Sequence, residues 1–171
     1  GVTVSGGEPL NQYPFVARLF ERLHAVGVHT ALDTCGMASA AAFDAVLPYT
    51  DYVLFDIKLL DPDLHKQYTG QSNAIILQNL QTVAETIRRS NGAMHLWIRT
   101  PLIPDATATP DNIAAIGRYI HQHLADVAVG GFAGSARAPS AQRQPVGTLR
   151  RTAQRTGVKL HFRAVHVVRP R

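Results

Sequence analysis

Strand-like and helix-like segments alternate along the first 124 residues, and this alternation constrains the fold more than any other feature. The strand-like segments occupy residues 1–5, 28–32, 51–58 and 95–103. The helix-like segments occupy residues 14–25, 39–47, 74–90 and 110–124. Serial βα units of about 30 residues form a parallel sheet with right-handed crossovers. The pattern therefore predicts an α/β protein with either an open doubly wound sheet or a full or partial barrel.

The alternation stops near residue 126, and the charge changes at the same point. Residues 1–126 contain all 12 acidic residues and 8 of the 17 basic ones, whereas residues 127–171 contain nine basic residues and no acidic one. A folded surface normally mixes both signs. We expect a domain over residues 1–126, an irregular Gly/Ala/Ser/Arg-rich linker or aberrant segment over 127–147, and a terminal helix and strand over 148–171.

Size and cysteine content bound the class of protein. With 171 residues and 46% apolar composition, the chain can bury a sizeable core. It has no apolar run long enough to cross a membrane and no signal-peptide pattern, so we expect a cytoplasmic protein without a membrane partner. Its single cysteine, Cys35, excludes an internal disulfide, and no Cys/His cluster has metal-site spacing.

Polar residues follow each of the four strand-like segments. They are Gly6, Gly7, Glu8, Asp33, Thr34, Asp56, Lys58 and Arg99. Ligands of parallel α/β sheets and barrels bind at the carboxyl ends of the strands, so we expect these residues to face one mouth. Purely structural roles are the alternatives: a tight turn for the glycine pair, and a helix cap for Asp33 and Thr34.

The pair formed by Asp56 and Lys58 is the sharper signal. The two residues are two positions apart on an otherwise apolar strand, so their side chains point to the same face. Charges on a buried strand are costly unless they lie at its end or act on a ligand, which favours a functional site. Arg99 could bind a carboxylate of a ligand or form a structural salt bridge with Asp56.

The histidines show no paired spacing on one face. We therefore expect several of them on helix or loop surfaces without a functional role, namely His24, His29, His65, His121 and His123.

Four quoted segments carry a resemblance to a known family. In chain order they are "VTVSGGEPL", "ALDTCG", "DYVLFDIKLLDPDLHKQYTGQSN" and "WIRTPLIPDATATPDNIAAIG". Together they resemble the activating enzymes of glycyl radical enzymes, the pyruvate formate-lyase activating enzyme group of the radical S-adenosylmethionine superfamily. The resemblance covers residues 1 to about 124 and implies a partial (β/α)6 barrel, here incomplete at the N-terminus, with S-adenosylmethionine and a [4Fe-4S] cluster as cofactors.

The resemblance also implies roles for individual residues. Gly6, Gly7 and Glu8 match the motif that binds the methionyl amine, and Ser5 lies beside it. Lys58 matches a lysine that contacts the cofactor carboxylate, and Arg99 matches an arginine close to the site. Three further residues match the family's monovalent-cation site: Asp33, Thr34 and Asp56.

The implied activity is reductive cleavage of S-adenosylmethionine, followed by abstraction of hydrogen from a glycine of the partner. The implied partners are a glycyl radical enzyme as protein substrate and an electron donor such as flavodoxin or ferredoxin. The family's CxxxCxxC triad lies upstream of the GGE motif, where this sequence begins, and Cys35 alone does not hold a cluster. We therefore expect a fragment that is inactive alone and binds neither cofactor tightly.

Two other functions stay open from the residues alone. A non-radical α/β-barrel lyase or aldolase could use Lys58 and Asp56 for proton transfer. A nucleic-acid-binding module could use the basic segment after residue 126, although the charge distribution over the whole chain argues against it.

Overall fold

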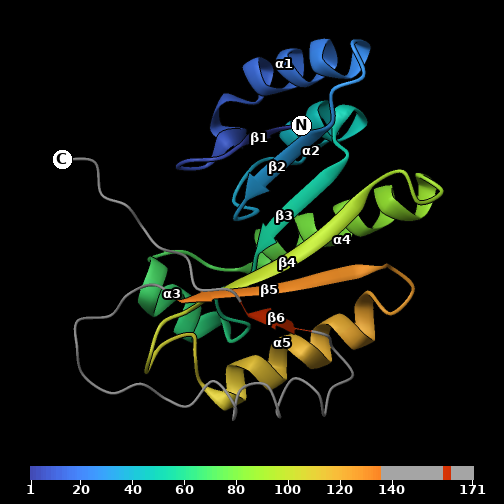
Figure 1. The fold of residues 1–171 in the computed structure, drawn as a ribbon. Coiled ribbons are helices and arrows are strands. Elements are labelled where there is room, and N and C mark those ends of the chain that lie inside the picture. The colour runs from blue at the N-terminus through green and yellow to red at the C-terminus, as the bar shows by residue number, and fades with distance from the viewer. Residues whose placement is uncertain (136–159, 163–171) are drawn as a thin grey trace.

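The computed structural model describes residues 1–135 and 160–162, which form one parallel sheet with helices packed against it (Figure 1). The six strands follow one another in the sheet in chain order, and every neighbouring pair is parallel. They are β1 (Val2–Val4), β2 (Thr30–Thr34), β3 (Tyr52–Asp56), β4 (His95–Leu102), β5 (Val129–Ser135) and β6 (Leu160–Phe162). This order is that of an open or partial barrel, so the predicted fold class is confirmed.

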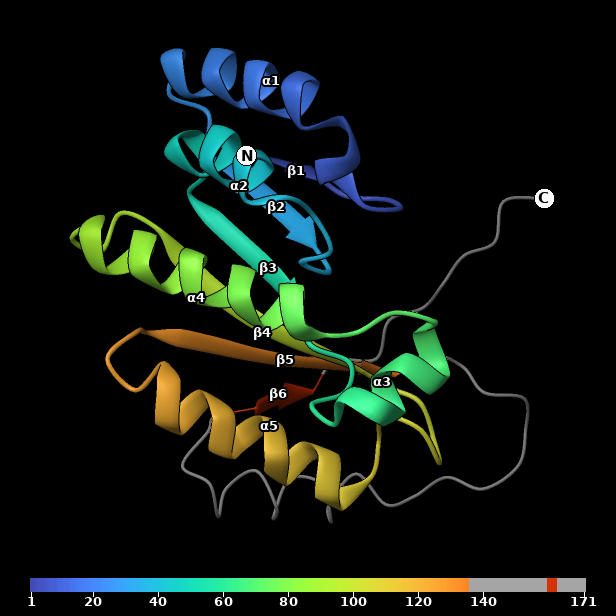
Figure 2. The same ribbon diagram turned by 180° about the vertical axis from the view of Figure 1, so that it is seen from behind.

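Four helices belong to one layer. They are α1 (Tyr13–Ala25), α2 (Ala40–Val46), α4 (Ala74–Arg89) and α5 (Pro110–His123). Helix α4 lies behind β3 and β4 in Figure 1 and in front of them in Figure 2, where the molecule is seen from the other side. Residues of all four helices join one buried cluster, so the opposite face of the sheet is left without a helix in the described part of the chain.

Local capping explains where several helices begin. The Ser39 hydroxyl accepts a hydrogen bond from the Ala42 N–H at the start of α2. Thr109 caps α5 in the same way, and Pro110 fits the first turn because its missing N–H is not needed there. The boundaries predicted for these helices differ from those observed by at most one residue.

One helix, α3 (Pro62–Thr69), was not predicted from the sequence. Asp61 caps it by accepting from the Asp63 and Leu64 N–H groups at 2.9 Å, and Gly70 ends it in the left-handed conformation. The helix is two turns long and only His65 on it is buried, so its apolar periodicity is too weak to detect.

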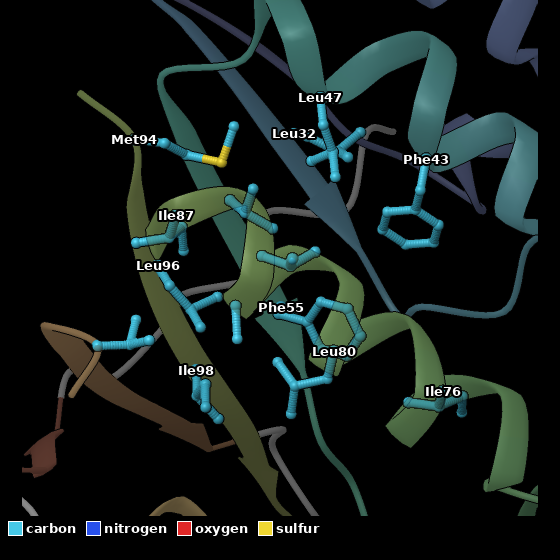
Figure 3. Packing of buried hydrophobic residues seen from close by; sticks show 14 of the residues in the cluster. Leu32, Phe43, Leu47, Phe55, Ile76, Leu80, Ile87, Met94, Leu96 and Ile98 are labelled. Atoms are coloured by element: carbon cyan, nitrogen blue, oxygen red, sulfur yellow. The ribbon is translucent and has the colours of Figure 1, made fainter. Parts of the chain in front are cut away.

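The core lies between the sheet and the helix layer (Figure 3). Leu32, Phe55 and Leu96 point from three neighbouring strands toward Phe43 of α2 and Leu80 of α4, and all five side chains are fully buried. Alternate strand residues point to the other face, which carries the polar side chains. The sheet therefore separates an apolar layer from the face where a ligand could bind.

The segment after residue 126 differs from its prediction. The sequence predicts an irregular linker over residues 127–147, whereas the structure has strand β5 at Val129–Ser135, paired with β4 from Leu96 to Leu102. Parallel pairing uses backbone groups that any residue except proline supplies, and this segment contains none. Strand β6 agrees with the strand expected within residues 148–171, and the helix expected there lies outside the described residues.

Candidate functional site

The turn after β1 is open to its surroundings. Gly6 and Gly7 have φ values of 96° and 55°, and nothing lies within 4 Å of where a Cβ atom would stand on either residue. Residues with a side chain rarely adopt this left-handed backbone region, so the turn depends on glycine. A backbone without side chains at the mouth of the sheet lets a ligand approach the peptide groups directly.

The carboxylate of Glu8 is turned toward the end of β2. It accepts hydrogen bonds from the Thr34 hydroxyl at 2.9 Å, from the Cys35 N–H at 2.9 Å and from the Cys35 thiol at 3.0 Å. It also accepts from the Leu10 N–H at 3.1 Å and so caps the short helix Pro9–Gln12. We call Glu8, Thr34 and Cys35 the Glu8 network; it ties the first loop to the second strand.

The thiol of Cys35 is held in its neutral form. Burial raises the pKa of this group above its ordinary value, and the hydrogen bond to Glu8 raises it further. A neutral thiol is a weak nucleophile and a poor metal ligand. Cys35 therefore serves as a hydrogen-bond donor in the Glu8 network.

A second network lies on the helix-free face, where the ends of β2 and β3 adjoin Arg99 in the middle of β4. Arg99 donates from Nη1 to Asp33 Oδ2 at 3.1 Å, from Nη2 to Asp33 Oδ1, and from Nε to Asp56 Oδ1 at 2.9 Å. The Ser5 hydroxyl donates to Asp33 Oδ2 at 2.9 Å, and Lys58 Nζ lies 3.8 Å from Asp56 Oδ2. We call Asp33, Asp56, Lys58 and Arg99 the Arg99 network.

The two carboxylates and two cations of the Arg99 network balance in charge. Burial raises the pKa of Asp56, and the positive charges of Arg99 and Lys58 act against this shift. Burial alone would lower the pKa of Arg99, but hydrogen bonds and charge from Asp33 and Asp56 outweigh it and raise the value. The guanidinium therefore stays charged, and it holds the two acids together.

The structure thus brings the predicted residues to one edge of the sheet but divides them into two sets. Asp33 and Thr34 are adjacent in β2 and point to opposite faces, so Thr34 joins Glu8 while Asp33 joins Arg99. The salt bridge between Arg99 and Asp56, one of the two alternatives for this arginine, is present.

Two asparagines that the sequence analysis did not single out hold the backbone behind Lys58. Asn112 donates to the carbonyl oxygens of Lys58 and Thr107 at 2.9 Å and accepts from the Leu60 N–H at 3.2 Å. Asn73 donates to the Leu60 carbonyl oxygen at 2.9 Å. Both amides are buried, and they fix the chain where β3 ends. Their only signal in the sequence is a position at the start of a predicted helix.

His65 is buried, so its predicted place on the surface is wrong. Its Nδ1 lies 2.8 Å from the Gln71 carbonyl oxygen and 3.1 Å from the Thr69 hydroxyl oxygen. It thereby secures the end of α3, the helix missed from sequence.

Comparison with known proteins identifies the family. Residues 1–114 match the model of the radical SAM superfamily. The chain belongs to this superfamily.

Its relatives are activating enzymes. The isethionate sulfite-lyase activating enzyme of Oleidesulfovibrio alaskensis is 40% identical over 118 residues, which make up 69% of this chain and 37% of that protein. The pyruvate formate-lyase-activating enzyme of Staphylococcus epidermidis is 37% identical over 127 residues, 71% of this chain and 48% of that protein. The chain thus spans less than half the length of these relatives, and the predicted resemblance to the activating-enzyme group is confirmed.

A solved structure supports the same assignment. A domain of pyruvate-formate lyase-activating enzyme from Bacteroides vulgatus superposes with a TM-score of 0.74 at 26% identity, covering 95% of this chain and 98% of that one. Streptococcus suis SuiB bound to S-adenosylmethionine superposes with a TM-score of 0.69 at 12% identity, which shows a shared fold.

The cofactors implied by the superfamily fit this chain unequally. The charged groups of the Arg99 network and the open glycine turn suit an amino-acid zwitterion such as the methionyl end of S-adenosylmethionine. A [4Fe-4S] cluster needs several thiolates, and the 171 residues contain one cysteine, whose thiol donates to Glu8. These residues do not fit a cluster.

Within residues 1–135 and 160–162, His, Cys, Asp and Glu side chains form no group of three or more placed to hold a metal ion. None of the described helices is long and apolar enough to cross a membrane.

Proposed function

We propose that this chain supplies the S-adenosylmethionine-binding edge of a glycyl-radical enzyme activating enzyme. The observation that carries the proposal is the Arg99 network beside the glycine turn, near the carboxyl ends of β1 to β3 in a chain of the radical SAM superfamily. Charged groups of both signs next to an exposed backbone are what a zwitterionic ligand requires.

Each predicted residue has a role in this proposal. The peptide groups of Gly6 and Gly7 take the methionyl amine, and the Lys58 ammonium takes the carboxylate. Asp33, held by Arg99 and Ser5, keeps the Arg99 network in place beside the glycine turn. Glu8 acts through its hydrogen bonds to Thr34 and Cys35, which fix the glycine turn against β2.

S-adenosylmethionine supplies hydrogen-abstraction chemistry when an external electron cleaves its carbon–sulfur bond. The task of these residues is to bind and orient it and to exclude water from it. The protein substrate in this proposal is a glycyl radical enzyme, the electron donor is a flavodoxin or ferredoxin, and the location is the cytoplasm.

Superfamily membership favours this proposal over the lyase or aldolase alternative. The same pair, Asp56 and Lys58, would perform proton transfer in that alternative. Lys58 Nζ is 3.8 Å from Asp56, and the acid is also engaged by Arg99, so Asp56 is not a free base for the lysine.

The test is a titration of the 171-residue chain with S-adenosylmethionine, followed by amide chemical shifts. We expect weak binding, with a Kd on the order of 1 mM, and shifts at Gly6, Gly7, Asp33 and Lys58. Lys58→Met should weaken binding about tenfold, which corresponds to roughly 1.4 kcal/mol. Lys66→Met, which changes an exposed lysine of α3, is the matched control.

Equal binding by wild type and Lys58→Met, or shifts confined to residues outside this edge, would contradict the proposal. A separate measurement concerns the cluster. Anaerobic reconstitution of the same chain with iron and sulfide should leave it without stoichiometric iron, because one cysteine cannot ligate a cluster.

A further inference from the structure

The acids expected to bind a monovalent cation already have a cation between them. Both oxygens of Asp33 accept from the Arg99 guanidinium, and Asp56 Oδ1 accepts from its Nε at 2.9 Å and lies 2.8 Å from its Nη2. The remaining oxygen, Asp56 Oδ2, lies 3.8 Å from Lys58 Nζ. Each carboxylate oxygen of the pair thus faces an arginine or lysine nitrogen.

The third expected ligand points elsewhere. The Thr34 hydroxyl lies on the opposite face of β2, where it donates to Glu8 and accepts from the Gly36 N–H at 2.9 Å. Alkali cations need several oxygen ligands around one point. Asp33, Thr34 and Asp56 do not provide such a point, so the residues do not fit the cation that the family resemblance implies.

We propose that Arg99 is the site's own cation, and that Asp33 and Asp56 bind neither Na⁺ nor K⁺ while the guanidinium lies between them. Asp56 and Arg99 are direct partners in the register of β3 and β4, and Asp33 lies on the next strand. The strand register therefore places the arginine beside the two acids.

Charge supports the same conclusion. Two carboxylates, one guanidinium and one ammonium balance, so an added Na⁺ or K⁺ would be repelled by Arg99 and Lys58 without finding an uncompensated acid. The guanidinium also makes directional hydrogen bonds to both acids, which a spherical ion does not. The inference concerns inorganic cations alone and does not depend on the proposed function.

The first test uses the unmodified chain. Thermal unfolding is measured in NaCl, KCl and choline chloride at equal ionic strength, and ²⁰⁵Tl⁺ NMR reports binding of an alkali-like ion directly. We expect equal unfolding midpoints in the three salts and no saturable Tl⁺ shift. A saturable rise with Na⁺ or K⁺ that disappears in Asp33→Asn would overturn the proposal, and a rise that persists in Asp33→Asn comes from elsewhere and agrees with it.

The second test removes the internal cation. In Arg99→Gln the two acids lose their shared partner, so we expect the unfolding midpoint to become saturably dependent on Na⁺ or K⁺ relative to choline. Arg118→Gln, which changes an exposed arginine of α5, is the control and should show no such dependence. A folded Arg99→Gln without cation dependence would overturn the idea that Arg99 stands in for an ion. If Arg99→Gln does not fold, the Tl⁺ measurement on wild type still decides.

Discussion

The two polar networks at the end of β2 begin at adjacent residues but solve different physical problems. Thr34 enters the Glu8 network, in which one carboxylate accepts from uncharged donors: a hydroxyl, a peptide N–H and a thiol. Asp33 enters the Arg99 network, in which carboxylates face a guanidinium and an ammonium. The alternation of side chains along one strand separates them.

This difference assigns distinct tasks to residues that share one sequence motif. The Glu8 network is partly buried and links the glycine turn to β2, so we expect its contribution to be structural. The Arg99 network lies on the helix-free face. Its acid and guanidinium side chains are 20–25% exposed, so a ligand could contact them there. We therefore expect substitutions in the Glu8 network to affect mainly folding, and substitutions in the Arg99 network to affect ligand binding as well.

The largest effect is expected at Gly36, whose N–H donates to Thr34 in the Glu8 network. It has φ 77°, and an added Cβ would lie 3.0 Å from Phe55 Cε1, closer still to Phe55 Cζ, and 3.2 Å from Ile76 Cγ2. Gly36→Ala should lower the free energy of unfolding by about 3 kcal/mol, from overpacking and left-handed backbone strain together. Urea unfolding measures this value.

Gly27→Ala is the control that separates the two causes. Gly27 has φ 71° but nothing within 4 Å of the added Cβ, so only the backbone strain of about 1 kcal/mol remains. Equal losses in the two variants would show that Phe55 moves aside and that the turn is not closely packed.

The next effect is expected in the Arg99 network. Arg99→Gln should lower the free energy of unfolding by about 2 kcal/mol, less than for a fully buried ion pair because solvent reaches these groups. The loss is measured by urea unfolding in choline chloride, where no alkali ion can replace the guanidinium. Arg118→Gln should leave stability within about 0.5 kcal/mol of wild type. If Arg99→Gln leaves the free energy of unfolding unchanged, Asp33 and Asp56 find other partners.

The sequence predicted what periodicity and strand ends encode. Four βα units, the parallel sheet and the polar residues at its carboxyl edge follow from apolar spacing and from the rule that ligands bind there. The caps at Ser39 and Thr109 lie where their residue types indicate. Local chemistry decides these features, so one sequence is enough to predict them.

Features that depend on distant partners were not predictable in the same way. The pairing of β5 depends on β4 rather than on its own apolar content. Helix α3 and buried His65 were missed for another reason: their contacts are local, but the segment is too short to show an apolar period. The roles of Asn73 and Asn112 arise because each side chain binds a backbone group near the end of β3 that lies at least 13 positions away in the sequence. The hydrogen bond of Thr34 to Glu8, in place of a shared site with Asp56, was also not predictable, because it depends on which face of the sheet each side chain occupies.

A smaller effect is expected from Glu8→Gln. The substitution keeps an acceptor in nearly the same place but removes the charge that strengthens its bonds to Thr34 and Cys35, so we expect a loss of about 1.5 kcal/mol in urea unfolding. Glu85→Gln, an exposed position of α4, should change stability by less than about 0.5 kcal/mol. If Glu8→Gln instead leaves stability unchanged and weakens S-adenosylmethionine binding, the carboxylate belongs to the ligand rather than to the fold.

The smallest effect is expected in the pH dependence of stability, to which Cys35 of the Glu8 network should contribute. Because burial and the bond to Glu8 raise the pKa of the Cys35 thiol from its ordinary value of 9.0, the folded chain keeps a proton that the unfolded chain releases. The folded state binds more protons in this range, so stability must fall as pH rises above 9, by at most about 1.4 kcal/mol per pH unit for one proton. Cys35→Ala should remove this part of the alkaline slope in urea unfolding, whereas Arg99→Gln should retain it. An identical slope in wild type and Cys35→Ala would mean that the thiol is not protected by the Glu8 network, and the distinction between a network of neutral donors and one of ion pairs would then rest on geometry alone.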